Sequence, residues 1–198
     1  MQLFDVNKEE FMANTIEYYN KNAEQFVQGT LSVNFTATQE RFLAKLFIGA
    51  RILDFGCGSG RDTKYFLDKG YQVDATDGSE ELCRRASEYT GISVKQMLFE
   101  ELNEKGKYDA IWACSSILHL PYPELVDVMK KMSIALKEKG FIYTSFKYGT
   151  YEGVRNSRYF TDMTEESTEK LLQEIPELQI DECWITSDVR PEGVRRSG

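Results

Sequence analysis

The stretch Ile-Leu-Asp-Phe-Gly-Cys-Gly-Ser-Gly at residues 52–60 decides the fold, because a short apolar run passes directly into a glycine-rich turn. The apolar run predicts a buried strand over 51–55, and the residues after the turn predict a helix over 61–68. Glycines let the backbone turn sharply and approach a ligand closely, and the next helix offers free N–H groups at its start. The stretch therefore predicts a ligand-binding loop at the end of a strand.

The spacing of the glycines disfavours two common phosphate-binding loops. A dinucleotide site has the fingerprint G-x-G-x-x-G/A, whose last small residue permits close helix–strand packing, but Arg61 holds that position here. A phosphate P-loop needs G-K-S/T, which this stretch lacks. Asp54, at the strand end, would repel a pyrophosphate and suits a cationic ligand. A nicotinamide-dependent oxidoreductase therefore stays only as the disfavoured alternative enzyme.

Asp77 is a second acidic residue at a predicted strand end, in Val-Asp-Ala-Thr-Asp-Gly-Ser at 73–79. An acid about twenty residues beyond such glycines can accept hydrogen bonds from both hydroxyls of a ribose. The alternative is an aspartate that forms a turn or caps the helix expected to begin at Glu80. We favour the ribose role, because it follows the rule for nucleoside sites in folds of this kind.

Apolar patterns on both sides of the loop predict alternating strands and helices. Strands are expected at 51–55, 71–76, 92–97, 108–114, 141–146 and 179–187, and helices at 8–26, about 38–47, 61–68, 80–89, 121–136 and 165–174, with Gly140 ending the helix before the strand at 141. This order implies a three-layer α/β fold, with a mostly parallel sheet, helices on both faces and an antiparallel last strand. Ligands bind such sheets at the carboxyl ends of the strands.

Four segments in this order resemble the class I S-adenosylmethionine-dependent methyltransferases: 52–60, 73–86, 108–113 and 135–141. The resemblance covers roughly residues 18–161. Within the class, Gly-Ser-Gly-Arg-Asp at 58–62 and Leu-His-Leu-Pro at 118–121 are most similar to the small bacterial methyltransferases of the tellurite-resistance type. The resemblance implies a Rossmann-like methyltransferase fold and S-adenosylmethionine as the cofactor.

Carried over by position, the resemblance implies a cofactor site at the ends of successive strands, closed by an N-terminal helix. Its members would contact the methionine part, the ribose, the adenine and the sulfonium: Tyr19, Asp54, Gly56, Cys57, Gly58, Arg61, Asp77, Gly78, Met97, Leu98, Cys114 and Ser115. Arg61 is expected either at the cofactor carboxylate or on the surface.

The predicted reaction is in-line transfer of a methyl group to a small-molecule acceptor, with placement and exclusion of water as the main contributions. His119 is a candidate general base, and the alternative is a packed histidine with one hydrogen bond. Candidate acceptor residues, whose cations would suit an anion, are Tyr18, Lys147, Tyr148, Arg155 and Tyr159, together with Arg158 and Phe160. A non-catalytic S-adenosylmethionine-binding regulator is the alternative of another class.

Composition restricts the partners. The net charge of −8 disfavours nucleic acid, whose binding needs a basic face. The first residues do not resemble a signal peptide and no apolar stretch is long enough to span a bilayer, so we expect a cytoplasmic protein without a membrane partner. The four cysteines have no metal-ligand spacing and the chain has one histidine, so we expect reduced thiols and no metal.

The expected organisation is one domain over 1–187 with an N-terminal helical cap at about 1–48. The residues 188–198 have the composition of a tail, so the final strand typical of the family is expected to be missing. A sheet that ends early exposes an edge, which invites pairing with another chain. We therefore expect either a shortened protein or a homodimer that covers this edge.

Overall fold

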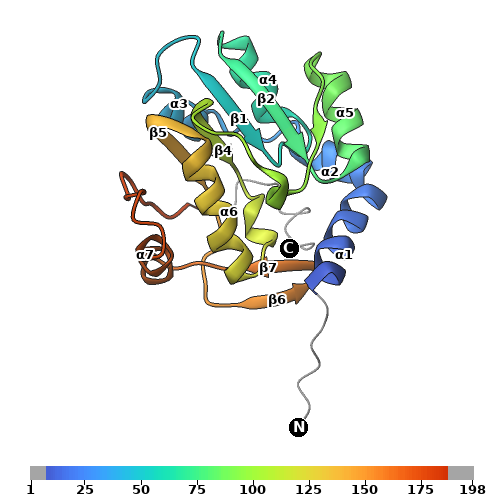
Figure 1. Cartoon of the computed structure of the whole chain (residues 1–198). Helices are drawn as coiled ribbons and strands as arrows, with labels where there is room; N and C mark the ends of the chain where they lie inside the picture. Colours follow the sequence, from blue (N-terminus) through green and yellow to red (C-terminus); the bar gives the residue numbers. More distant parts are fainter. Residues whose placement is uncertain (1–7, 187–198) are drawn as a thin grey trace.

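The protein is described by a computed structural model over residues 8–186, with side chains from residue 13 onward. Its centre is a parallel sheet of five strands in the order β3-β2-β1-β4-β5 (Figure 1). The strands are β1 (Arg51–Phe55), β2 (Gln72–Asp77), β3 (Lys95–Gln96), β4 (Tyr108–Ala113) and β5 (Leu136–Thr144). The strand order reverses between β1 and β4, so a crevice is expected at their carboxyl ends.

Helices cover both faces of this sheet, as the sequence predicts. They are α1 (Lys8–Lys21), α2 (Ala23–Thr30), α3 (Thr36–Leu43), α4 (Arg61–Asp68), α5 (Glu80–Thr90), α6 (Tyr122–Ala135) and α7 (Glu165–Gln173), with short 3₁₀ turns η1 (Phe99–Glu101) and η2 (Ile117–His119). The strand at 51–55 and the helix at 61–68 have the predicted bounds, and the other parallel strands differ from their predicted bounds by a few residues.

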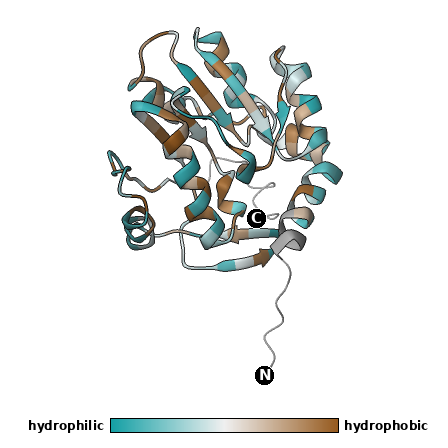
Figure 2. Cartoon of the chain, in the orientation of Figure 1, coloured by the Kyte–Doolittle hydropathy of each residue, from teal (hydrophilic) through white to brown (hydrophobic). Residues whose placement is uncertain are grey.

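Side chains that alternate along the strands supply a core on each face. Ile52 and Trp112 pack with Phe66 of α4 on one face. Leu53 packs with Met129 of α6 on the other face. Figure 2 shows apolar residues gathered on the central strands and on the sides of the helices that face them. Burial of these side chains is the main stabilising contribution to the fold.

The single helix predicted over 8–26 is wrong, because the chain breaks into α1 and α2 at Asn22. Asn22 leaves the helical conformation, with φ −111° and ψ 16°. Its side-chain Nδ2 donates a hydrogen bond to the carbonyl of Tyr18 at 2.8 Å. An asparagine that bonds to the local backbone competes in this way with helix continuation. The break lets α2 take a new direction over the glycine loop.

The prediction that Gly140 ends the helix before β5 is also wrong. Helix α6 ends at Ala135, and Gly140 lies inside β5. The segment before β4 takes the last helical carbonyls, since Gly106 N donates to Ile134 O and Lys107 N donates to Ala135 O. Strand pairing therefore begins directly after the helix, and the extra residues 137–140 are absorbed by a shift of register.

The strand predicted over 179–187 is not formed in its described part, since residues 179–186 contain no strand. Lys45 of the segment after α3 binds Asp181 and Glu182, and Arg41 of α3 lies over the ring of Trp184. The antiparallel element is a separate pair, β6 (Glu152–Arg155) with β7 (Arg158–Thr161). The predicted tail at 188–198 lies outside the described residues.

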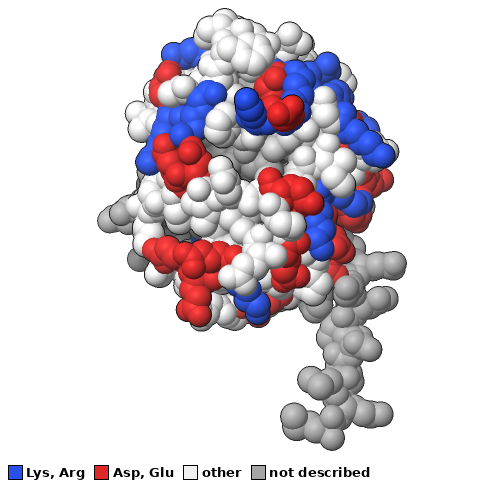
Figure 3. All heavy atoms as spheres, turned by 60° about the vertical axis from the view of Figure 1, so that its left-hand side comes forward, with Lys and Arg blue, Asp and Glu red and all other residues white. Residues whose placement is uncertain are grey.

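The described surface carries charges of both signs. On the face shown in Figure 3, Lys and Arg side chains alternate with Asp and Glu side chains, without one continuous basic patch. Within residues 8–186, no helix is both long and apolar enough to cross a membrane.

Candidate functional site

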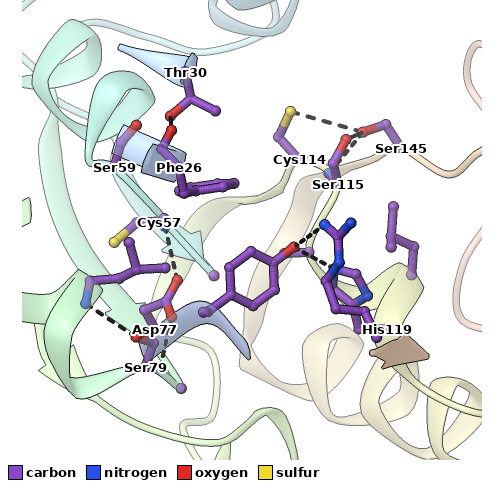
Figure 4. A pocket seen from close by; sticks show the side chains of 18 of the residues that line it. Phe26, Thr30, Cys57, Ser59, Asp77, Ser79, Cys114, Ser115, His119 and Ser145 are labelled. Carbon is purple, nitrogen blue, oxygen red and sulfur yellow. Dashed lines mark hydrogen bonds between the residues drawn. The ribbon is translucent and has the colours of Figure 1, made fainter. Parts of the chain in front are cut away.

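A cavity of about 820 Å³ opens at the carboxyl ends of the strands and is covered by α1 and α2. It brings together most of the predicted site residues. Those that line it are Tyr18, Tyr19, Asp54, Gly56, Cys57, Gly58, Arg61, Asp77, Gly78, Met97, Leu98, Cys114, Ser115, His119, Lys147 and Tyr148. Figure 4 shows Asp77 and Ser79 on one side, with His119, Cys114, Ser115 and Ser145 on the other.

The glycine loop is packed closely at Gly56. This residue has φ +84°, and a Cβ atom built on it would lie 2.5 Å from the Cβ of Ser116. Ser116 is itself held by a hydrogen bond from its hydroxyl to the carbonyl of Phe55 at 2.7 Å. A side chain at position 56 would therefore strain the backbone and displace the segment after β4.

Phe26 of α2 covers the loop from above. A Cβ atom at Gly58 would lie 2.9 Å from the Phe26 ring. Tyr19 of α1 contacts the same ring edge-on, with the centroids 5.2 Å apart. Phe26 was not predicted as a site residue, because its place over the loop depends on the break between α1 and α2. No local pattern in the sequence marks that contact.

Asp77 lies at the end of β2 and is held by backbone donors. Its Oδ2 accepts from Gly58 N and its Oδ1 accepts from Ser79 N, each at 2.9 Å. Burial raises the pKa of Asp77, although these backbone hydrogen bonds oppose the shift. Ser79, and not Asp77, caps α5, since Ser79 Oγ accepts a hydrogen bond from Leu82 N at the start of that helix. Asp77 therefore does not cap α5, but its bond from Ser79 N is the local turn that the alternative allows, and Asp77 also lines the cavity.

Asp54 lies deeper, at the end of β1, with 2% of its surface exposed. Its Oδ2 accepts a hydrogen bond from the hydroxyl of Thr63 at 2.5 Å. Burial raises the pKa of Asp54 well above its usual range, and the charge of the nearby Asp62 adds to the shift. A cation bound beside Asp54 would favour its charged form.

Asp62 accepts several buried hydrogen bonds, and it was not among the predicted site residues. Its carboxylate accepts from Gln39 Nε2, from Trp112 Nε1 and from both Nε and a terminal nitrogen of Arg61, at 2.7 to 2.9 Å. An acid in the first turn of a helix after a glycine loop was the available signal. Arg61 also lies over the ring of Phe35. Arg61 is therefore an ion-pair partner in the cavity wall and not an exposed surface arginine.

His119 ends η2 and is buried, with 6% of its surface exposed. Its Nε2 lies 2.8 Å from the hydroxyl of Tyr19, and its Nδ1 lies 2.6 Å from the carbonyl oxygen of Tyr159. Burial lowers the pKa of His119 to about 4, and the charges of Arg158 and Lys147 act in the same direction. The imidazole is therefore neutral at physiological pH.

The other end of the cavity is formed by aromatic and cationic side chains. The guanidinium of Arg158 lies 4.4 Å from the ring centroid of Tyr18, and the ammonium of Lys147 lies 4.5 Å from that of Phe160. Two predicted acceptor residues do not line the cavity. Arg155 pairs with Asp162, and Tyr159 directs its hydroxyl to Glu152. Tyr159 contributes instead through its backbone.

The charges on the cavity wall are sorted by position. Among the described residues, the acidic ones that line it are Asp54, Asp62 and Asp77, all beside the glycine loop. Arg61, the cation in that region, is neutralised by Asp62. Within residues 8–186, this end has acceptors that suit a cationic nucleoside and no unpaired cation for a phosphate. These acceptors fit S-adenosylmethionine better than a dinucleotide.

Comparison with solved structures defines the class of the fold. The structure of 1,6-didemethyltoxoflavin-N1-methyltransferase from Burkholderia thailandensis, with 1,6-didemethyltoxoflavin and S-adenosylhomocysteine bound, is similar with a TM-score of 0.72, 20% identity and coverage of 87% of this chain and 80% of that one. Magnesium protoporphyrin IX methyltransferase from Synechocystis PCC 6803 with bound S-adenosylmethionine is similar with a TM-score of 0.64, 17% identity and coverage of 87% and 88%. The chain has the Rossmann-like methyltransferase fold.

Sequence comparison then identifies the region that carries the site. Residues 52–140 match the methyltransferase domain family. N-terminal Xaa-Pro-Lys N-methyltransferase 1 from Xenopus tropicalis is 35% identical over 98 residues, which are 46% of this chain and 44% of that protein. The chain spans about half the length of the curated relatives it matches. Residues 52–140, which carry the glycine loop and the ends of β1, β2 and β4, are therefore similar to methyltransferase domains.

Proposed function

We propose that this protein is an S-adenosylmethionine-dependent methyltransferase that methylates a small-molecule acceptor by in-line displacement. The observation that carries the proposal is the sorting of charge in the cavity. Carboxylates surround the glycine loop, while cations and aromatic rings form the opposite end. One cavity thus has a place for a cationic nucleoside and a separate place for an acceptor.

Each cofactor residue has a separate task. S-adenosylmethionine, when bound, supplies a methyl group on a positively charged sulfur that is a good leaving group. Asp77 would accept from the ribose, and Asp54 would stabilise the positive amino-acid end. Cys114 and Ser115 would lie beside the sulfur. The covers α1 and α2 would exclude water and hold the acceptor in line, which are the main sources of rate in such a transfer.

The acceptor end supports the finer parts of the proposal. Tyr18, Tyr148, Lys147 and Arg158 would enclose a compact acceptor, and the two cations favour an anionic one. This second compartment also favours a catalyst over a non-catalytic regulator, which needs room for the nucleoside alone. The motifs at 58–62 and 118–121 support a place near the tellurite-resistance type.

Three further proposals follow from the sequence. A single domain over 1–187 is supported by α1 and α2, which line the same cavity as the end of β1 and the segment after β4. A cytoplasmic location is supported by four free cysteines. A homodimer is supported by β5, the last strand of the described sheet on its side. Light scattering that gives a strict monomer would exclude the dimer.

The experiment is a product screen. The protein is incubated with S-adenosylmethionine and, in separate reactions, small thiols, amines, hydroxyl compounds, metalloid oxyanions and short peptides, and S-adenosylhomocysteine is measured by mass spectrometry. The proposal predicts turnover with a small acceptor and none with the Asp77→Asn variant. Turnover with peptides alone would contradict the small-molecule acceptor, and binding without any turnover would favour the regulator.

A further inference from the structure

Three elements that are distant in the sequence meet at His119. Tyr19 comes from α1, His119 from η2, and the carbonyl of Tyr159 from β7. The hydroxyl of Tyr19 lies 2.8 Å from His119 Nε2, and His119 Nδ1 lies 2.6 Å from the carbonyl oxygen. A further hydrogen bond, from Tyr159 N to the hydroxyl of Thr15, fixes α1 against β7 at 3.1 Å. The group is thus held from two sides.

These contacts set the proton positions. A carbonyl oxygen only accepts hydrogen bonds, so the proton of the neutral imidazole is on Nδ1. Nε2 is then an acceptor, and the hydroxyl of Tyr19 must be its donor. Arg158 Nη1 donates a hydrogen bond to the oxygen of Tyr19 at 3.5 Å, which leaves one lone pair of that oxygen for a group inside the cavity that Tyr19 and His119 both line. His119 therefore reaches an acceptor through Tyr19.

We propose, building on the proposed methyltransferase function, that Tyr19 and His119 form a proton relay, and that the acceptor atom is a heteroatom that carries a proton and loses it. The acceptor lone pair forms the new bond to the methyl carbon as the carbon–sulfur bond breaks, and the bond electrons stay on sulfur. The acceptor proton passes to the Tyr19 oxygen while the Tyr19 proton passes to His119 Nε2.

The surroundings of His119 disfavour the protonated imidazole, so the ring readily loses that proton. The charged groups that face it are Arg158 of β7 and Lys147 of the segment after β5, and both oppose a positive imidazole. The ring of Phe160 packs against it with the centroids 4.7 Å apart, and Tyr19 packs from α1. Burial favours the neutral ring. The relay therefore holds the proton only until the product leaves, and the proton then passes back through Tyr19 to water that enters the cavity, which restores the neutral imidazole for the next turnover.

The first test is spectroscopic and needs no acceptor, because His119 is the single histidine of the chain. Nitrogen-15 labelling of histidine gives the Nδ1 and Nε2 resonances of one imidazole, which the proposal predicts to be the Nδ1–H form. Tyr19→Phe should shift the Nε2 resonance, because its donor is lost, while Tyr122→Phe, whose hydroxyl bonds to Glu174 outside the cavity, should not. The Nε2–H form, or no shift in Tyr19→Phe, would overturn the relay.

The second test separates the relay from cofactor binding. General acid–base groups contribute about 10²- to 10⁴-fold, so Tyr19→Phe should lower kcat about 100-fold or more with the acceptor found in the product screen. Calorimetry with S-adenosylmethionine separates the two effects, because the ring that remains in Tyr19→Phe still covers the loop, so the affinity should fall much less than kcat. Matched acceptors, a thiol against its thioether or a secondary against a tertiary amine, should show turnover of the proton-bearing member only.

The outcomes distinguish the two proposals. Wild-type turnover by Tyr19→Phe, or equal turnover of the proton-free acceptors, would overturn the relay and leave the methyltransferase function intact. Failure of the wild-type protein to bind S-adenosylmethionine would overturn the proposed function, and the histidine spectra would still test the hydrogen bonds of the Tyr19–His119 pair.

Discussion

Replacing Gly56 with alanine tests how closely the loop is packed, and Gly91 provides a matched control. The two residues have similar backbone angles, φ +84° and φ +79°. A Cβ atom at Gly56 would lie 2.5 Å from the Cβ of Ser116, whereas nothing lies within 4 Å of a Cβ atom at Gly91. The two substitutions therefore share the backbone cost and differ in steric overlap.

The expected magnitudes follow from these two contributions. A left-handed backbone costs a residue with a Cβ about 1–2 kcal/mol. The lower entropy of the unfolded alanine chain offsets about 0.4–1 kcal/mol of that cost. Gly91→Ala should therefore lower the free energy of unfolding by about 0–1.6 kcal/mol. Overpacking adds about 1–3 kcal/mol, so Gly56→Ala should lower it by about 1–4.6 kcal/mol and by more than Gly91→Ala.

Urea denaturation of the two variants and the wild-type protein measures this difference. Gly56→Ala should also weaken binding of S-adenosylmethionine, because Ser116 and the loop move apart, whereas Gly91→Ala should leave the affinity unchanged. Equal destabilisation by the two substitutions would show that the close contact between position 56 and Ser116 has no energetic consequence, and it would contradict this prediction.

Three further predictions concern the buried charges. Because burial lowers the pKa of His119 to about 4 from an unfolded value near 6.5, the neutral form is stabilised and stability is lost as the pH falls; urea titrations should show a loss of about 2 kcal/mol from this group between pH 7 and pH 5, which His119→Gln removes. Asp62→Asn should destabilise the fold by about 3–5 kcal/mol, because it breaks a buried pair, whereas Asp68→Asn, whose partner Lys64 is a surface neighbour, should have little effect in the same assay. Because the pKa of Asp54 is raised, binding of a cation should release a proton and should strengthen as the pH rises; calorimetry in buffers of different ionisation enthalpy measures this, and a buffer-independent heat would contradict it.

The central part of the fold was predictable because its signals are local. The strand β1, the loop and α4 are encoded in one continuous stretch, and Asp54 and Asp77 follow from strand ends that parallel pairing brings together. The end of α6 was not predictable, because Gly106 and Lys107 determine it from a distant segment. Glycine commonly ends a helix, but here the chain already pairs with β4 in the sheet before it reaches Gly140.

In the site, too, residues with local signals were predictable, and residues placed by distant contacts were not. The residues at strand ends were found from spacing, since a parallel sheet places all of its carboxyl ends at one edge. Phe26 and Asp62 were missed, because their roles depend on where α2 and the Trp112 side chain lie. The pairing of Tyr19 with His119 joins residues 100 positions apart, and no periodic pattern in the sequence links them. Contacts between elements therefore account for most of what the sequence did not reveal.

The sheet and the helices above it place the groups that the proposed reaction needs around one cavity. The strand order brings the ends of β1, β2 and β4 to one edge, the glycine loop leaves backbone donors there, and α1 closes the edge from above. Tyr19 and Phe26 belong to this cover, so binding and proton transfer depend on the same helices. A change that loosens α1 should therefore affect the acceptor end before it affects the sheet.

Calorimetric titration of S-adenosylmethionine into the wild-type, Asp77→Asn and Asp74→Asn proteins measures whether Asp77 holds the cofactor. Asp74 lies on the same strand but pairs with Arg51 and Lys107 away from the cavity, so it is a matched control. We expect S-adenosylmethionine to bind at one site, Asp77→Asn alone to lose affinity for it, and NAD not to bind. Tight binding of NAD, or equal affinity of the two variants for S-adenosylmethionine, would contradict it.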